Sequence, residues 1–333
     1  MAALDRRAFI GSSIAFGAAL HSLPSWARGP ASYPPPDREA MVPVSGGRVY
    51  VRINGNLNAP RPPVVFLHGG PGGTHAAYLD ALALANERAV ILYDQLESGR
   101  SDRPNNPAYW TVARFTDEIG AVAAGLGVRR WHVVGHSWGG TIALEYGARR
   151  PAELAGLVLA SPLISTRSWI ADANALRAEL PADAQATLAT CDPPRPITPV
   201  CEKATEVFYR EFNGRYPRSD GMRDYAMAMN TAGKGANNDL YNAMWGSSEF
   251  VATGTLKDYD GEPLLAKLDG KNTLFIDGQY DEARPVTLAA FAARVPGAEF
   301  AVVPGAAHGF FSDRPEEALG ILRPWLRQHD PAR

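Results

Sequence analysis

The sequence predicts an α/β fold in which a mostly parallel sheet is flanked by helices and carries an inserted helical cap. Short continuous apolar runs, such as residues 64–67, alternate with amphipathic stretches, a pattern typical of parallel strands covered by helices on both faces. The alternation stops over residues 163–260, which contain helix-like stretches and no clear strands, and it resumes at Thr273. The chain has 333 residues, enough for one large domain with such an insertion.

Strands and helices are expected to alternate along the rest of the chain. Residues 112–126 are predicted to form an amphipathic helix, because their apolar residues recur at intervals of three and four and Gly127 ends the run. The core is assigned to residues 41–162 and 261–329, and the cap over 163–260 follows the sixth or seventh strand. The other expected elements are a hairpin over 42–53, strands over 64–67, 89–93, 131–134, 157–160, 273–276 and 300–303, and helices over 141–149, 286–295 and 315–327.

The amino-terminal residues 1–27 have the layout of a twin-arginine-type signal peptide. The pair Arg6-Arg7 precedes a mildly apolar stretch over 10–20, and residues 25–27 (Ser-Trp-Ala) place small side chains where a signal peptidase reads them. An ordinary amphipathic helix is the alternative. The apolar run is shorter than the ~20 residues that cross a bilayer, so no stable membrane association is expected. The protein is thus expected to be periplasmic or secreted, with a loose, proline-rich leader over 28–40.

Charge and cysteine content exclude several classes of protein. Lys and Arg number 33 against 35 Asp and Glu, with no basic stripe, which argues against nucleic-acid binding. The two cysteines, Cys191 and Cys201, are too few for a zinc site, and no histidine or carboxylate cluster has ligand spacing. We therefore expect no metal and no cofactor. In an oxidising compartment the cysteines either form a disulfide or remain free thiols.

Residues 135–139 read Gly-His-Ser-Trp-Gly and match the Gly-x-Ser-x-Gly turn that presents a nucleophile in α/β-hydrolases. The serine of this turn lies between a strand and a helix, and small residues on either side allow the two elements to approach closely. Here the motif follows the apolar run over 131–134 and precedes a helix, as the turn requires. Ser137 is therefore the predicted nucleophile of a serine hydrolase.

A serine nucleophile needs a base and an acid that orients the base, and in α/β-hydrolases these follow in the order Ser, Asp or Glu, His. His308 follows the last expected strand in a glycine-rich loop and is the predicted base. Asp281 follows the strand over 273–276, at the end where catalytic groups gather in such sheets, and is the predicted acid. Asp277 competes for this role but lies closer to the strand.

A glycine-rich loop follows the first buried strand and predicts an oxyanion hole. Residues 68–73 read His-Gly-Gly-Pro-Gly-Gly, and glycines there allow backbone N–H groups to face a developing oxyanion. We assign the hole to the N–H groups of Gly70 and Trp138, and we expect His68 to hold the loop. A phosphate-binding loop is excluded because neither Lys nor Ser/Thr follows in the required position.

These motifs, taken together, resemble the prolyl aminopeptidase (proline iminopeptidase) family, which includes relatives that hydrolyse amino-acid amides. The similarity spans residues 41–325. The segments that carry it are His-Gly-Gly-Pro-Gly-Gly at 68–73, Tyr-Asp-Gln at 93–95, Gly-Arg-Ser-Asp at 99–102, Gly-His-Ser-Trp-Gly-Gly at 135–140, Met-Trp-Gly at 244–246, Glu-Phe at 249–250, Gly-Thr-Leu-Lys-Asp at 254–258 and Tyr-Asp-Glu at 280–282.

The resemblance implies that Glu249 and Glu282 hold the free α-amino group of a small peptide or amino-acid amide substrate. A protonated amine in a cleft needs a carboxylate partner, or desolvation cancels its binding. The sequence departs from the family at Glu97, where a glycine is usual, and at residues 247–248, where Ser-Ser replaces Pro-Asn. Residues 233–238 of the cap (Gly-Lys-Gly-Ala-Asn-Asn) also differ.

The predicted function is a serine aminopeptidase or amidase that cleaves the amide bond after an N-terminal amino acid. One alternative is a neutral amide, ester or lactone hydrolase of the same fold that does not require a free amine. Another is a catalytically inactive binding protein, against which the complete Ser, Asp and His set argues. Epoxide hydrolases and dehalogenases are excluded, because they need Asp where Ser137 stands.

Overall fold

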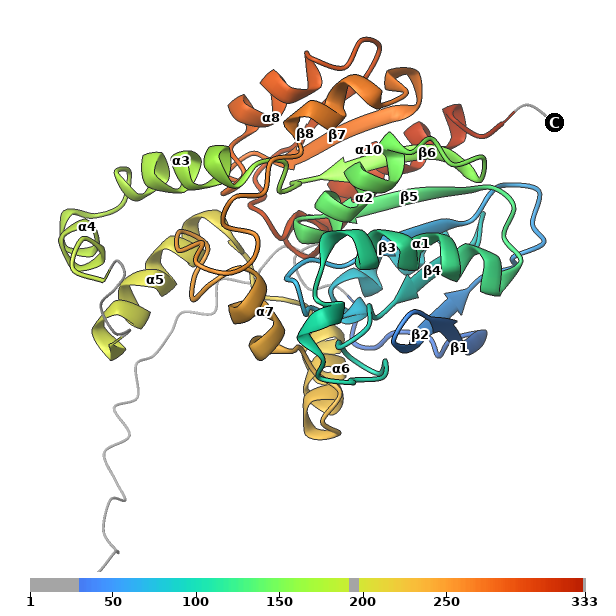
Figure 1. Ribbon diagram of the computed structural model, residues 1–333, viewed down its shortest axis with the longest axis horizontal. Helices are drawn as coiled ribbons and strands as arrows, with labels where there is room; N and C mark the ends of the chain where they lie inside the picture. The colour runs from blue at the N-terminus through green and yellow to red at the C-terminus, as the bar shows by residue number, and fades with distance from the viewer. Residues whose placement is uncertain (1–29, 192–197, 332–333) are drawn as a thin grey trace, which may run out of the picture.

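The structure is a computed structural model that describes residues 30–191 and 198–331. The predicted signal peptide, residues 1–27, lies outside the described residues. Figure 1 shows a twisted central sheet with helices on both sides and a further group of helices at one end. No helix within the described residues is long and apolar enough to span a bilayer.

The described residues form one eight-stranded sheet with the order β1-β2-β4-β3-β5-β6-β7-β8. β1 and β2 form a hairpin, β2 pairs with β4 in antiparallel fashion, and every later pair is parallel. The parallel strands therefore end at one edge, where loops can carry a site. The strands are β1 Arg38–Val44, β2 Gly47–Asn54, β3 Val64–Leu67, β4 Val90–Tyr93, β5 Trp131–His136, β6 Leu154–Ala160, β7 Thr273–Gly278 and β8 Glu299–Val303.

Helices cover both faces of the sheet, which confirms the predicted α/β architecture. Alternate residues of β3 face opposite layers: Val65 and Leu67 pack with α1, α2 and α8, whereas Val64 and Phe66 pack with η2, α9 and α10. The helices outside the insertion are η2 His75–Leu84, η3 Pro107–Tyr109, α1 Val112–Leu126, α2 Trp138–Ala148, η4 Glu262–Lys267, η5 Gly270–Asn272, α8 Pro285–Ala292, α9 Phe310–Asp313 and α10 Pro315–Gln328.

A helical segment separates β6 from β7, which places it after the sixth strand. Its helices are α3 Thr166–Arg177, α4 Ala182–Leu188, α5 Pro199–Phe212, α6 Asp220–Thr231 and α7 Asn238–Met244. Side chains of α3, α4 and α5 share a separate apolar cluster, and in Figure 1 these helices extend to the left of the sheet. In contrast, Met222 of α6 and Leu240 of α7 are buried in the two clusters of the core. The segment thus has an outer part and a part packed on the sheet layers.

The expectation of a loose, proline-rich leader is wrong for the part of it that the structure describes. β1 already begins at Arg38. Prolines lack an N–H group but keep a carbonyl acceptor, and two of these carbonyls are used. The buried guanidinium of Arg52 donates to the carbonyl of Pro34, and the Asn54 side chain donates to that of Pro35 at 2.8 Å. Residues 34–35 of the leader are therefore hydrogen-bonded to side chains of β2.

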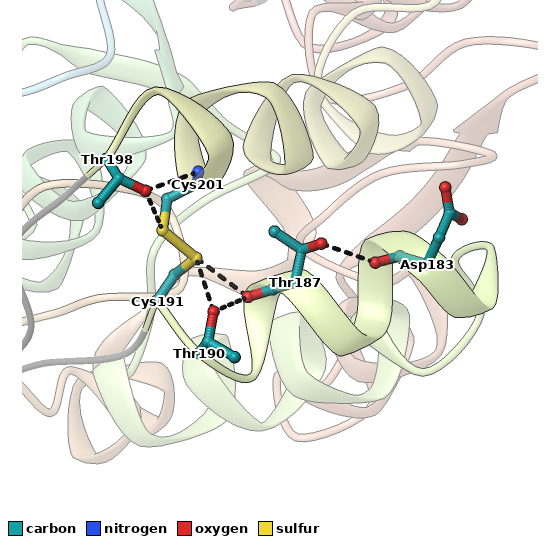
Figure 2. Close-up of a disulfide and its surroundings, with 6 residues drawn as sticks. All are labelled: Asp183, Thr187, Thr190, Cys191, Thr198 and Cys201. Atoms are coloured by element: carbon teal, nitrogen blue, oxygen red, sulfur yellow. Dashed lines mark hydrogen bonds between the residues drawn. A yellow bond between two sulfur atoms is a disulfide. The ribbon is translucent and has the colours of Figure 1, made fainter.

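A disulfide joins Cys191 to Cys201, so of the two states left open by the sequence the structure has the bonded one. The bond connects the turn that follows α4 to the first turn of α5 (Figure 2). Thr198 caps α5, because its hydroxyl accepts a hydrogen bond from the Cys201 N–H at 3.3 Å. The disulfide thus fixes the start of α5, whose other end reaches the candidate site.

Candidate active site

Ser137 lies in a strained turn between β5 and α2. Its φ of 57° and ψ of −123° are unusual for a residue other than glycine. The flanking glycines explain how the turn is tolerated: a Cβ atom on Gly135 would lie 2.2 Å from the carbonyl oxygen of Gly139, and one on Gly139 would lie 2.1 Å from that of Leu67. The helix begins at Trp138, three residues before the predicted start at Thr141, because it follows the turn directly.

The structure brings His308 and Asp281 together, although they follow different strands. Nδ1 of His308 lies 2.8 Å from Oδ1 of Asp281. Asp281 is buried and accepts further hydrogen bonds from the Ala283 N–H at 2.9 Å and from the Ser161 hydroxyl at 2.5 Å. Burial acts to raise the pKa of Asp281, but His308 and these hydrogen bonds hold it below its ordinary value. Asp281 therefore remains a carboxylate that orients the imidazole.

The backbone of His308 is held by the end of α5 and by the nucleophile turn. Its N–H donates to the carbonyl of Phe212 at 3.1 Å, and its carbonyl oxygen lies 2.8 Å from Nε2 of His136, which must be the donor. Burial acts to lower the pKa of His308. The negative charges of Asp281, Glu282 and Glu249 outweigh burial and raise it to about 9.

Asp277, the competing acid, lies next to Asp281 and makes no hydrogen bond or ion pair with His308 among the described residues. Its Oδ1 accepts from the Gly278 N–H at 3.1 Å and lies 3.2 Å from the hydroxyl of Ser161. Burial and the neighbouring carboxylate of Asp281 raise the pKa of Asp277 well above its ordinary value. A protonated Asp277 can donate to Asp281, so we interpret it as a positioning residue.

A cavity of about 200 Å³ lies at the carboxyl edge of the sheet, with Ser137, His308, Gly70 and Glu249 among its lining residues. Within the described residues, Ser137 Oγ makes no hydrogen bond to His308, although both face this cavity. Catalytic hydrogen bonds are often long in free enzymes and tighten when substrate binds. The geometry therefore places the predicted nucleophile and base on one small cavity.

The loop after β3 is tied to the nucleophile turn by Gln95. Its side chain donates to the carbonyl of His68 at 2.8 Å and accepts from Nε1 of Trp138 at 2.9 Å. Nε2 of His68 accepts from the Gln95 N–H at 2.9 Å, so His68 holds the loop as expected. Gly70 has a φ of 113°, which favours glycine, and a Cβ atom on Gly69 would lie 3.0 Å from that of Ser137. The loop therefore lies against Ser137.

Glu282 lies beside His308, Glu249 lines the same cavity as His308, and each glutamate is held by a residue of the inserted segment. Oε1 of Glu249 accepts from the Tyr241 hydroxyl at 2.7 Å, and Oε1 of Glu282 accepts from the Asn213 amide at 2.7 Å. Oε1 of Glu282 is also 3.7 Å from Nε2 of His308. Burial raises the pKa of both glutamates, and the charge of Glu249 raises that of Glu282 further. Glu249 therefore supplies a carboxyl group to the cavity wall, and Glu282 supplies a second one behind it, next to His308.

The residues that depart from the family fit their positions. Glu97 adopts a φ of 72°, which explains why glycine is usual there, and its carboxylate accepts from Nε1 of Trp110 at 3.1 Å. Ser248 accepts from Nε1 of Trp245 at 2.9 Å through its carbonyl, directly before Glu249. In the segment 233–238, the Asn237 N–H donates to the carbonyl of Gly72 at 2.8 Å, which docks this segment on the glycine-rich loop.

Several supporting residues could not be found by sequence reasoning. Asn213, which donates to Glu282, is 69 residues away from it in sequence. Tyr241, which donates to Glu249, lies on α7, whereas Glu249 follows that helix. Ser161 lies within hydrogen-bond distance of both Asp277 of β7 and Asp281, and Gln95 joins the loop after β3 to Trp138 of α2. Neither spacing nor periodicity reveals such contacts, because each one depends on how separate elements meet in space.

Comparison with known proteins places this fold and site in a class. The chain matches the family model described as the alpha/beta hydrolase fold over residues 62–315. It is 34% identical to a proline iminopeptidase of Heyndrickxia coagulans over 291 residues, which cover 86% of this chain and 98% of the relative.

Solved structures agree with the sequence comparison. The proline iminopeptidase of Mycobacterium smegmatis is 34% identical with a TM-score of 0.78, over 88% of this chain and 99% of that one. VinJ is 32% identical with a TM-score of 0.80 over the same shares. The protein is thus an α/β-hydrolase, and the chain belongs to the proline iminopeptidase family within that class.

The position of Asp277 generates a testable prediction. Asp277→Asn should keep kcat/KM within a few-fold of wild type, because a neutral amide can still donate to Asp281. Asp277→Leu should lower kcat/KM about tenfold, since Asp281 loses a hydrogen-bond partner worth about 1–3 kcal/mol. Steady-state kinetics on a prolyl arylamide measure both. The interpretation is wrong if Asn is as damaging as Leu while both variants remain folded by circular dichroism.

Proposed function

We propose that the protein is a serine aminopeptidase that hydrolyses the amide bond after the N-terminal residue of a small peptide or amino-acid amide, with proline favoured. The observation that carries this proposal is a pair of glutamates near His308: Glu249 lines the cavity that contains Ser137, and the buried carboxylate of Glu282 lies 3.7 Å from Nε2 of His308. The proline iminopeptidase relatives support the same substrate class.

The chemistry follows from the roles of the three catalytic residues. Nε2 of His308 accepts the proton of the Ser137 hydroxyl while Oγ attacks the scissile carbonyl, and the N–H groups of Gly70 and Trp138 stabilise the oxyanion. Trp138 is suited to this role because it starts α2, where N–H groups have no intrahelical partner. The imidazolium then protonates the leaving amine, the acyl-serine forms, and water hydrolyses it by the same steps in reverse.

The acidic pair gives the reason for a free-amine substrate. Oε2 of Glu282 is buried and has no hydrogen-bond partner among the described residues, which leaves a costly unsatisfied acceptor. A substrate ammonium between Glu249 and Glu282 would satisfy that oxygen and offset the repulsion between the two carboxylates. A neutral or N-acylated substrate offers no such compensation, so the pair should select for the free amine.

The same charge pair links amine binding to catalysis. Without substrate, the charges of Asp281, Glu282 and Glu249 favour the protonated imidazole and raise the pKa of His308 to about 9. An ammonium beside Glu249 and Glu282 cancels their charge and lowers the pKa of His308. Binding of the correct substrate should therefore favour the neutral imidazole that takes the proton of Ser137.

Free-amine dependence is tested with a prolyl arylamide, its N-acetylated form and a nitrophenyl ester. Glu249→Gln or Glu282→Gln should lower kcat/KM on the prolyl arylamide about thirtyfold or more, because truncating one partner of a buried charge pair costs about 2–5 kcal/mol. The ester should be affected far less, and the N-acetylated arylamide should be a poor substrate of the wild type.

Two variants serve as controls. Glu206→Gln removes an exposed carboxylate from α5 and should leave kcat/KM unchanged. Ser137→Ala should abolish turnover and labelling by a fluorophosphonate. Equal kcat/KM on free and N-acetylated arylamides would contradict the amine-binding role and favour a neutral amide or ester hydrolase.

We also propose that the protein is exported to the periplasm or beyond through the twin-arginine route. The pair Arg6-Arg7 supports this, as does the disulfide between Cys191 and Cys201, a bond that persists in oxidising compartments. The mature protein should begin near Arg28, which amino-terminal sequencing measures. Replacing both arginines with lysine should retain an active protein in the cytoplasm, and unchanged export of that variant would refute the route.

A further inference from the structure

Arg218 introduces a positive charge at the otherwise acidic cavity. Its side chain lines the cavity together with Ser137, His308 and Glu249. Among the lining residues of the described chain, Arg218 is the one with a permanent positive charge. The cavity therefore has both an acidic and a basic wall, with the nucleophile in the same small space.

The backbone around Arg218 is fixed, which makes the position of the side chain specific. Asp313 accepts the N–H groups of Arg215 at 3.1 Å and Tyr216 at 3.2 Å. On the other side, the Ser219 hydroxyl caps α6. The guanidinium also lies near the Tyr78 hydroxyl on the cavity wall: burial raises the pKa of Tyr78, and the charge of Arg218 acts in the opposite direction.

Within the described residues, the Arg218 guanidinium makes no hydrogen bond or ion pair. Nearby acidic groups are already engaged, since Asp220 pairs with Arg223 and Asp313 accepts backbone N–H groups. A planar guanidinium at the mouth of a cavity is suited to bind a carboxylate through two parallel hydrogen bonds.

We propose that Arg218 binds the terminal carboxylate of the substrate, so that the preferred substrates are dipeptides or similarly short peptides with both ends charged. The inference rests on the proposed function, in which Glu249 and Glu282 hold the amine. The cavity of about 200 Å³ is smaller than the ~300–1,000 Å³ of ordinary ligand pockets, which favours a substrate of this size. The scissile carbonyl then lies between the two charged ends, at Ser137.

The experiment compares prolyl-alanine with prolyl-alanine amide, which differ only in the terminal charge. The wild type should show a kcat/KM about tenfold higher on the free dipeptide, as expected for one charge-assisted contact at a partly exposed site. Arg218→Gln should reduce that ratio to about one, and Arg218→Lys should retain part of it. Because Arg218 is exposed, added salt should also reduce the ratio.

Arg210→Gln is the matched control, because it removes an exposed arginine on α5 that does not line the cavity, and it should keep the wild-type ratio. A ratio of one in the wild type, or an unchanged ratio in Arg218→Gln, would overturn the inference. A prolyl arylamide, which lacks the carboxylate, separates the two proposals. If the wild type cleaves it without favouring the free dipeptide, only the role of Arg218 fails. If it cleaves no free-amine substrate, the proposed function fails as well.

Discussion

The arrangement of the site depends on one constraint, which is that the two buried carboxylates of Asp281 and Glu282 and the half-buried carboxylate of Glu249 lie near a single imidazole. Asp281 contacts Nδ1 of His308, Glu282 lies near Nε2, and Glu249 lies close enough to raise the pKa of His308. Negative charges at this density are costly away from water unless cations or hydrogen bonds compensate them. His308 supplies one compensating charge, and on our proposal the substrate ammonium supplies the other. On this proposal, binding of the free amine and the protonation state of His308 depend on the same carboxylates.

Two parts of the fold supply the side chains of this site, namely the parallel sheet and the inserted helical segment. The parallel strands bring Ser137, Asp281 and His308 to one edge of the sheet, as the chain order of such hydrolases requires. The inserted segment supplies the groups that hold the acidic pair, Tyr241 for Glu249 and Asn213 for Glu282. The disulfide fixes one end of α5, and the carbonyl of Phe212 at its other end accepts the His308 N–H.

The sequence was sufficient to predict the parts of this structure that depend on local pattern. Short apolar runs and their alternation with amphipathic stretches predicted the strands. The predicted position of the site followed from the Gly-x-Ser-x-Gly turn and from the loops that carry Asp281 and His308 after their strands. Spacing could not reveal that the pKa of His308 is raised to about 9, because the carboxylates that raise it come from other parts of the sequence and meet the imidazole only in the fold. The order of the proline-rich leader is hidden from the sequence for a similar reason, since the carbonyl oxygens of Pro34 and Pro35 are bound by side chains of another element, Arg52 and Asn54 of β2.

The central claim is that a bound ammonium converts His308 from an acid into a base. Nuclear magnetic resonance of the His308 imidazole in the Ser137→Ala protein, which cannot turn over substrate, measures this directly. The free protein should titrate at a pKa of about 9. Saturation with prolinamide should lower that pKa toward the ordinary value of about 6.5, and N-acetylprolinamide should leave it unchanged. A pKa that stays the same or rises when prolinamide binds would contradict the account.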